Sequence, residues 1–196
     1  MGPKAHIDNG NYDDITEDDG KELIEISRKA IEDYILHKHV PGQEICKGKF
    51  SANAGVFVTI KEGGQLRGCI GFPRGSYSLC EATIKSAIYS ATEDPRFRKI
   101  GRDELDHLEI EVTVLGTPQL LDQKSGSFLD SIKIGTDGLI VETDYTSGLL
   151  LPSVAVEENF SKEEFLSATC IKAGLDEDCW KRPEIRIYRI PGKVFR

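Results

Sequence analysis

The sequence predicts an α+β fold with a mainly antiparallel sheet and flanking helices. Strand and helix patterns alternate irregularly along the 196 residues, and short turns join several of the strand patterns. Such turns connect antiparallel neighbours, whereas parallel strands need a long crossover connection. The chain is 39% hydrophobic and 30% charged, as in an ordinary globular protein, and its length suits one well-packed domain.

The first fifteen residues are polar and rich in Gly and Asp, so we expect a flexible tail over 1–15 and a single domain over 16–196. Thr16 has the character of a helix N-cap, and Asp19 adds an acidic first turn. Apolar residues at helical spacing follow, and they predict a helix that ends near His37.

Two further helices are predicted by S-x-x-E capping boxes. The box at Ser78 precedes an apolar stripe that stops at Asp94-Pro95. The box at Ser161 opens a helix that closes at Gly174.

The first predicted sheet elements are a hairpin and a separate strand. Residues 55–60 (GVFVTI) and 66–72 (LRGCIGF) flank Gly63-Gly64, which is a turn signal of two-residue hairpins. Residues 108–116 (LEIEVTVLG) alternate between apolar and polar positions, as in a half-buried strand.

The second half of the chain predicts a further hairpin over 131–142 that turns at Asp137-Gly138. An apolar extended segment follows over 148–157, in which Pro152 marks an edge or a bulge. The last predicted strand is 184–190 (EIRIYRI).

Composition excludes several classes of protein. The net charge of −8 argues against broad nucleic-acid binding, which depends on basic side chains, and no apolar run is long enough to span a membrane. Five cysteines, with no CxxC spacing and no secretory signal, argue against a disulfide framework and a zinc ribbon. We therefore expect a cytoplasmic protein.

The patterns that would indicate a metal or a bound cofactor are missing from the sequence. It contains no HExxH spacing, no GxxxxGK[ST] loop and no GxGxxG loop. We predict neither a metal site nor a cofactor. Cys80 and Cys170 share faces with the apolar stripes of their helices, so we expect both to be core residues.

The segment LRGCIG is the best candidate for a site. Arg67 and Cys69 project from the same face of their strand, and a guanidinium beside a thiol would favour the reactive thiolate. Gly68 and Gly71 lack side chains and would let a ligand or a second backbone approach closely.

The register of the hairpin decides what Cys69 does. With a two-residue loop, Cys69 lies opposite Val58 and joins the core. With a loop of odd length, Cys69 instead joins Phe57, Thr59 and Lys61 on a mixed surface that suits a site. The sequence is compatible with both registers.

The string LRGCIG resembles the signature of the AMMECR family, in its prokaryotic single-domain form. The resemblance extends over residues 18–195 and includes EDPRF (93–97), IEVTVL (110–115) and GLLLPSVA (148–155). It implies one α+β domain of two unequal lobes, with the LRGCIG strand lining a cleft between them. It also implies a site at Arg67, Gly68, Cys69 and Gly71, with Asp94 and Arg96 as companions.

Two hypotheses for the function follow. In the first, Cys69 and Arg67 act on a small molecule or modified nucleotide, with Glu111 as the nearest acid–base group, although exposure to solvent is expected for both Glu109 and Glu111. In the second, the chain is a non-catalytic module that holds a partner protein. The family's gene neighbourhoods imply a pathway link to Memo-like and radical-SAM proteins. The sequence does not decide whether the protein is an enzyme.

Overall fold

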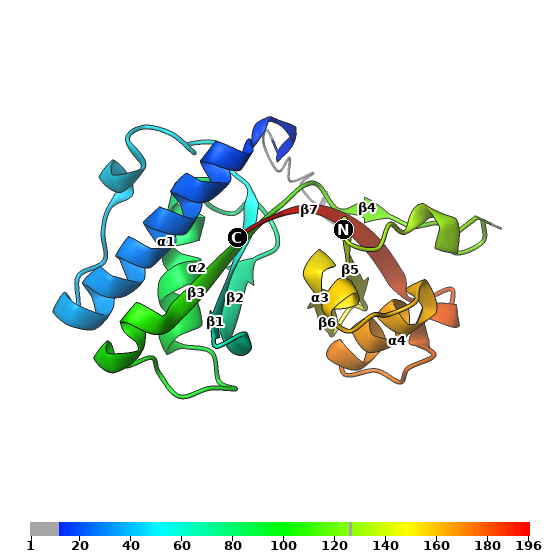
Figure 1. Cartoon of the computed structure of the whole chain (residues 1–196). Coiled ribbons are helices and arrows are strands. Elements are labelled where there is room, and N and C mark those ends of the chain that lie inside the picture. The colour runs from blue at the N-terminus through cyan, green and yellow to red at the C-terminus, as the bar shows by residue number, and fades with distance from the viewer. Residues whose placement is uncertain (1–11, 126) are drawn as a thin grey trace. The chain divides into compact units, whose positions relative to one another are not determined.

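The structure, a computed structural model, describes residues 12–125 and 127–196 and consists of two compact units of unequal length (Figure 1). Unit 1 holds the described residues up to Gly116 together with Val194–Arg196, and unit 2 holds Thr117–Lys193. Residues 1–11 of the predicted tail lie outside the described residues, and Tyr12–Asp14 forms a short 3-10 helix. Both units pair strands antiparallel and pack helices against them, which confirms the predicted fold class.

Unit 1 contributes three neighbouring strands to the sheet, in the order β2-β1-β3. Its elements, in chain order, are α1 (Glu17–His37), 3-10 helix η2 (Gln43–Cys46), β1 (Gly55–Glu62), β2 (Gln65–Phe72), α2 (Leu79–Thr92), 3-10 helix η3 (Arg102–His107) and β3 (Leu108–Leu115). The predicted caps are confirmed: Thr16 and Ser78 each accept the backbone N–H three residues on.

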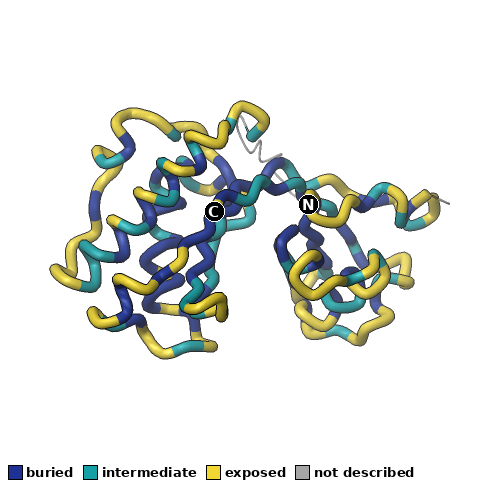
Figure 2. Tube along the Cα trace, in the orientation of Figure 1, coloured by how far each residue is buried: buried dark blue, intermediate teal, exposed yellow. Residues whose placement is uncertain are grey.

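Helices α1 and α2 pack against one face of this sheet, because alternate strand residues are apolar and point toward them (Figures 1 and 2). Val56, Val58 and Ile60 of β1 are fully buried there with Leu23 and Ile31 of α1. The side chains between these positions therefore point to the other face of the sheet, and that face carries the candidate site.

Unit 2 pairs β5 with β6 and with β7, and the short β4 also pairs with β7. Its elements are β4 (Gln119–Leu120), η4 (Leu129–Ser131), β5 (Asp137–Glu142), β6 (Ser147–Leu150), α3 (Pro152–Glu157), α4 (Lys162–Lys172), η5 (Cys179–Lys181) and β7 (Arg186–Phe195), whose last two residues belong to unit 1. In the core of unit 2, Phe165 and Leu166 of α4 pack with Leu139 and Ile187.

Two sequence predictions in unit 2 are wrong. The predicted hairpin over 131–142 is one strand, β5, preceded by a tight turn that closes when the Lys133 N–H donates to the Asp137 carboxylate at 2.9 Å. The predicted extended segment 148–157 bends into helix α3, and Pro152 is its first residue. Proline suits that position because a first helical residue needs no N–H partner.

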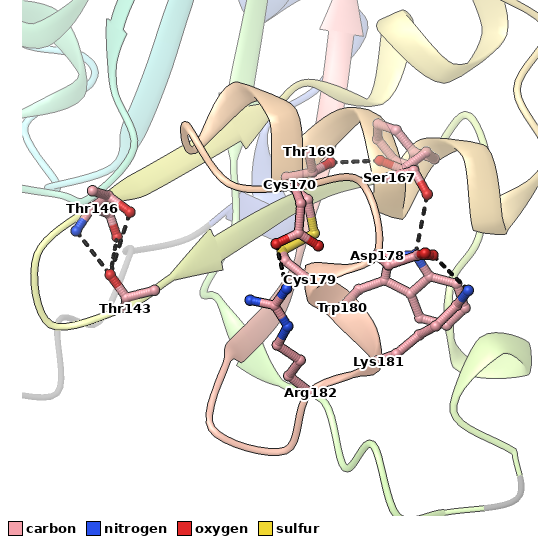
Figure 3. Close-up of a disulfide and its surroundings, with 12 residues drawn as sticks. Thr143, Thr146, Ser167, Thr169, Cys170, Asp178, Cys179, Trp180, Lys181 and Arg182 are labelled. Atoms are coloured by element: carbon pink, nitrogen blue, oxygen red, sulfur yellow. Dashed lines mark hydrogen bonds and ion pairs between the residues drawn. A yellow bond between two sulfur atoms is a disulfide. The ribbon is translucent and has the colours of Figure 1, made fainter.

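The prediction that argued against disulfides is also wrong. Cys46 of η2 is bonded to Cys80 of α2, and Cys170 of α4 is bonded to Cys179 of η5, so the core positions of Cys80 and Cys170 serve as bridge sites. Figure 3 shows the second bridge beside Trp180, whose indole N–H donates to the Ser167 hydroxyl at 3.1 Å. An odd number of cysteines leaves one unpaired, and that one is Cys69.

Among the described residues, no helix combines the length and the apolar character needed to cross a membrane. Nor do three or more His, Cys, Asp or Glu side chains gather into a possible metal site within 12–125 and 127–196.

Candidate functional site

A β-bulge in the first hairpin decides the position of Cys69. The loop has two residues, Gly63 and Gly64, both with positive φ, and Glu62 pairs with Gln65 as expected for such a loop. The pairing then shifts between Ile60 and Lys61, because Arg67 is an extra residue in β2. Cys69 therefore lies opposite Thr59 rather than Val58, and the prediction that a two-residue loop buries Cys69 in the core is wrong.

The bulge brings a thiol, a hydroxyl and a carboxylate into one row across the three strands. Thr59 of β1 pairs with Cys69 of β2 on one side and with Glu111 of β3 on the other, so all three side chains share a face. In the next row, Phe57 pairs with Gly71 and with Thr113. We call the face that carries Phe57, Thr59, Cys69, Glu111 and Thr113 the polar face.

The thiol of Cys69 is half-buried and accepts a hydrogen bond from the Thr59 hydroxyl at 3.3 Å. Burial raises the pKa of this thiol above its ordinary value. The hydrogen bond from Thr59 and the charge of Arg96 lower the pKa in part, and the charges of Asp94 and Glu111 raise it again. Cys69 is therefore held as a neutral thiol at pH 7.

Asp94 and Arg96 bind the backbone of Cys69. The Cys69 N–H donates to Oδ2 of Asp94 at 2.9 Å, and the Arg96 guanidinium donates to the Cys69 carbonyl at 3.3 Å and to Oδ2 of Asp94 at 2.7 Å. Ser90 of α2 accepts the Ile70 N–H at 2.7 Å. The same Ser90 hydroxyl donates to the Val58 carbonyl of β1, so it bridges the two strands. Asp94 and Arg96 occupy outward-facing hydrogen-bonding groups of the edge strand β2, which discourages the addition of another strand there.

Hydrogen bonds also set the charge state of Asp94. Burial alone would raise the pKa of this carboxyl, but the hydrogen bonds from Arg96 and Cys69 outweigh burial and lower the pKa to about 2. Asp94 is therefore ionised at every physiological pH.

The two glycines of the motif lie where another backbone approaches closely, so a side chain at either position would collide with it. A Cβ on Gly68 would lie 2.1 Å from the Ser90 carbonyl of α2. A Cβ on Gly71 would lie 2.2 Å from the Val56 carbonyl and 2.4 Å from the Phe57 ring. The alternative of a second backbone therefore holds for both positions.

Arg67 does not reach the thiol, contrary to the prediction. Its guanidinium donates to both oxygens of Glu104, at 3.0 and 3.2 Å, and also to the carbonyls of Arg98 and Lys99. The guanidinium thus forms a two-pronged contact with the carboxylate of Glu104 in η3. The charge that favours the thiolate comes from Arg96 instead.

Glu111 is buried, although solvent exposure was expected for both glutamates of β3. Its Oε2 accepts a hydrogen bond of 2.6 Å from Arg196, but its Oε1 is buried and has no hydrogen-bond partner among the described residues. The hydroxyl of Thr113 is also buried and has no hydrogen-bond partner among the described residues. Glu109 is exposed as expected, and it accepts the Gly64 N–H at 3.2 Å. A buried acceptor without a donor costs free energy, so a partner for Oε1 would be stabilising.

The sequence did not indicate every residue of this site. Thr59 appeared only in the alternative register, and Ser90, Glu104 and Arg196 carry no local signal, because each acts across a large sequence separation. A separate cavity of about 380 Å³ lies between Tyr12–Asp19, residues 48–54 and Leu79. None of the predicted site residues lines that cavity.

Comparisons with known proteins agree on one family. The family model described as AMMECR1 matches residues 24–195. Protein TK0174 of Thermococcus kodakarensis is 44% identical over 182 residues, which cover 90% of this chain and 89% of the relative. A protein of Methanothermobacter thermautotrophicus is 43% identical over 186 residues, which cover 94% and 97%. The crystal structure of the uncharacterized protein PH0010 from Pyrococcus horikoshii aligns with a TM-score of 0.82 at 42% identity and covers 89% of both chains.

Proposed function

Because the chain belongs to the AMMECR1 family, whose relatives named above carry no stated activity, we propose a function from the geometry of the polar face. The polar face binds a small molecule that donates a hydrogen bond to Glu111 and lies beside the thiol of Cys69. The observation that carries this proposal is the buried Oε1 of Glu111, which lacks a donor among the described residues. A ligand N–H or O–H would supply one.

The ligand class that fits best is a neutral, planar N–H donor such as a nucleobase or nucleoside. The charge of Glu111 is already balanced by Arg196, so a neutral donor suffices. Phe57 offers a partly exposed ring on the same face, on which a planar ring could stack. These features support the modified-nucleotide hypothesis.

A catalytic role for the thiol is part of the proposal. Cys69 is the free cysteine among the described residues, and Glu111, in the same row, is the acid–base group nearest to it along the sheet. Asp94 and Arg96 hold the backbone of Cys69 in place, and Arg67 fixes the preceding bulge. All three are positioning residues in this proposal, while Cys69 and Glu111 face the ligand.

We also propose a cytoplasmic location and a pathway link to Memo-like and radical-SAM proteins. Disulfides are rare in most cytoplasmic proteins, but they are common in intracellular proteins of hyperthermophilic archaea, so the two bridges are compatible with that location.

The test is a thermal-unfolding screen with nucleobases, nucleosides, methylated nucleosides and amino acids. A ligand at a hundred times its Kd stabilises the native state by about 3 kcal/mol, so the Tm of the wild-type protein should rise by several degrees. Glu111→Gln should abolish the rise, because its amide oxygen would turn toward Arg196 and leave an NH2 group facing the ligand's donor. Glu109→Gln is the matched control and should keep the rise, since Glu109 is exposed.

If no compound of the screen raises the Tm, the small-molecule proposal fails and the non-catalytic interaction module becomes the better interpretation. A rise that persists in Glu111→Gln would show that the ligand binds elsewhere, and the cavity bordered by residues 48–54 would be the first place to look.

A further inference from the structure

The position of Thr59 between Cys69 and Glu111 suggests how the thiol is controlled. Thr59 is paired directly with both residues in the same row of the sheet. Its hydroxyl donates to the sulfur of Cys69 at 3.3 Å, so it stabilises negative charge there. Glu111 lies on the opposite side of Thr59, and its side chain is only 5% exposed, so its charge is weakly screened by water.

We propose that Cys69 is a ligand-gated thiol: the Thr59 hydroxyl favours its ionised form, the unpartnered oxygen of Glu111 opposes it, and a donor bound to Glu111 removes that opposition. This inference rests on the proposed function for the identity of the ligand contact. The interplay of the three side chains does not depend on any particular ligand.

The other charged groups near the thiol are bound to partners of their own, so Glu111 is the group through which a ligand would change the ionisation of Cys69. Asp94 and Arg96, from the segment after α2, are closed into a bidentate ion pair with each other. Arg67, on the same strand as Cys69, is bound to Glu104, and Lys61 of β1 lies one row away on the polar face. Glu111 is the acidic group here whose second oxygen still lacks a donor within the described chain.

The direction of each effect agrees with the electrostatics of the thiol. Burial makes the largest contribution and raises the pKa of Cys69, while the Thr59 hydrogen bond lowers it. The charge of Glu111 raises the pKa by a smaller amount. Donation of a hydrogen bond to Glu111 spreads its charge onto the ligand and weakens this last effect, so the thiol ionises at lower pH.

The reaction of the thiol has two steps. The thiol proton leaves for water, and the sulfur lone pair then attacks an electrophilic carbon. With iodoacetamide as the probe, a carbon–sulfur bond forms, the carbon–iodine bond breaks and iodide leaves. No oxidant or reductant is needed.

The experiment measures the rate at which iodoacetamide labels Cys69 in the native, non-reduced protein between pH 6 and 10, with peptide mapping by mass spectrometry. Glu111→Gln should move the midpoint of the rate profile about half a pH unit lower, which is about threefold faster labelling below the midpoint. Thr59→Val should move the midpoint higher by a similar amount, and Thr59→Ser should restore it because serine keeps the hydroxyl. Glu109→Gln should leave the midpoint unchanged.

Circular dichroism at each pH identifies a variant that fails to fold. If Thr59→Val does not fold, the labelling midpoints of Thr59→Ser and Glu111→Gln serve as the test. If the labelling midpoints of folded Glu111→Gln and Thr59→Val are unchanged, the proposed control of Cys69 is wrong. The proposal is also wrong if a nucleoside raises the Tm of the wild-type protein without lowering the labelling midpoint of Cys69. If the midpoints shift as expected while no screened compound raises the Tm, the coupling of the three side chains stands and the proposed ligand class fails.

Discussion

Asp94 accepts the backbone N–H of Cys69 at 2.9 Å, and the same carboxylate oxygen accepts the Arg96 guanidinium at 2.7 Å. A residue 25 positions along the chain thus fixes the peptide group of the free cysteine from outside the sheet. The EDPRF segment and the LRGCIG strand, which looked like two parts of a ligand site, are joined first by this structural contact.

We predict that Asp94→Asn lowers the stability of the protein in a pH-dependent way. The folded pKa of Asp94 is about 2, below its ordinary value of 3.8, so its ionised form stabilises the fold above about pH 4. That stabilisation, about 2 kcal/mol from the pKa difference, is lost as the pH falls through 2. Urea unfolding at pH 7 should show the difference between wild type and Asp94→Asn, and the two should converge toward pH 2.

Asp106→Asn is the matched control, because Asp106 is an exposed carboxylate. A difference for Asp94→Asn that stays constant from pH 7 to pH 2 would contradict the proposed linkage.

The predictions from sequence succeeded where the signal was local and failed where it depended on distant partners. The caps at Thr16 and Ser161 and the hairpin turn at Gly63-Gly64 are decided within a few residues, and all three are confirmed. The bulge at Arg67 depends instead on Glu104, which lies 37 residues away and holds the extra residue out of the ladder. One inserted residue reverses the face of every later side chain, so the position of Cys69 could not be read from the loop.

A similar reason explains the errors at Glu111 and at the disulfides. The alternation of apolar and polar residues in 108–116 correctly predicted that Glu109 and Glu111 share one face of the strand. It does not predict that Glu111 is buried on that face while Glu109 is exposed. Cys46 and Cys80 are 34 residues apart, and only the docking of η2 against α2 brings their Cα atoms within 6.2 Å. Spacing rules for cysteine detect local motifs, and this bridge is not local.

We predict that Arg67→Lys destabilises the protein without affecting the thiol. The Arg67 and Glu104 side chains are 11% and 5% exposed, and an ammonium cannot reproduce the two-pronged contact, so the cost should be about 2–4 kcal/mol. The labelling midpoint of Cys69 should stay within error of wild type. Arg98→Lys is the control, since Arg98 contacts the same carboxylate with a side chain that is 73% exposed, and it should cost under about 1 kcal/mol.

A lower labelling rate at pH 7 in folded Arg67→Lys would contradict this prediction, because it would mean that Arg67 acts on the sulfur as first expected from sequence.

We predict that Gly68→Ala destabilises unit 1 through helix α2. The new methyl group would meet a backbone carbonyl at 2.1 Å, so α2 or β2 must move, at a cost of about 2–3 kcal/mol. The Tm should fall, and the hydrogen bond of 2.7 Å between Ile70 and Ser90 should lose protection from amide exchange. An unchanged Tm in Gly68→Ala would show that this approach of helix and strand is not as close as described.

We predict one free thiol in each chain. All five cysteines lie within the described residues, and four of them are paired. Denatured but non-reduced protein should therefore react with one equivalent of a thiol reagent, and reduced protein with five. Two or more equivalents before reduction would show that at least one bridge is absent, and the site of labelling would identify which one.

The two disulfides should contribute unequally to stability. The bridge between Cys46 and Cys80 closes a segment of 34 residues, whereas the bridge between Cys170 and Cys179 closes one of 9. Since the entropy removed from the unfolded chain grows with loop length, the first bridge should stabilise the fold by about 4 kcal/mol and the second by about 3 kcal/mol. Guanidinium unfolding of the double alanine variants, Cys46→Ala with Cys80→Ala and Cys170→Ala with Cys179→Ala, measures both values. A larger loss from the shorter bridge would show that packing around Cys170 and Cys179, rather than loop closure, sets its contribution.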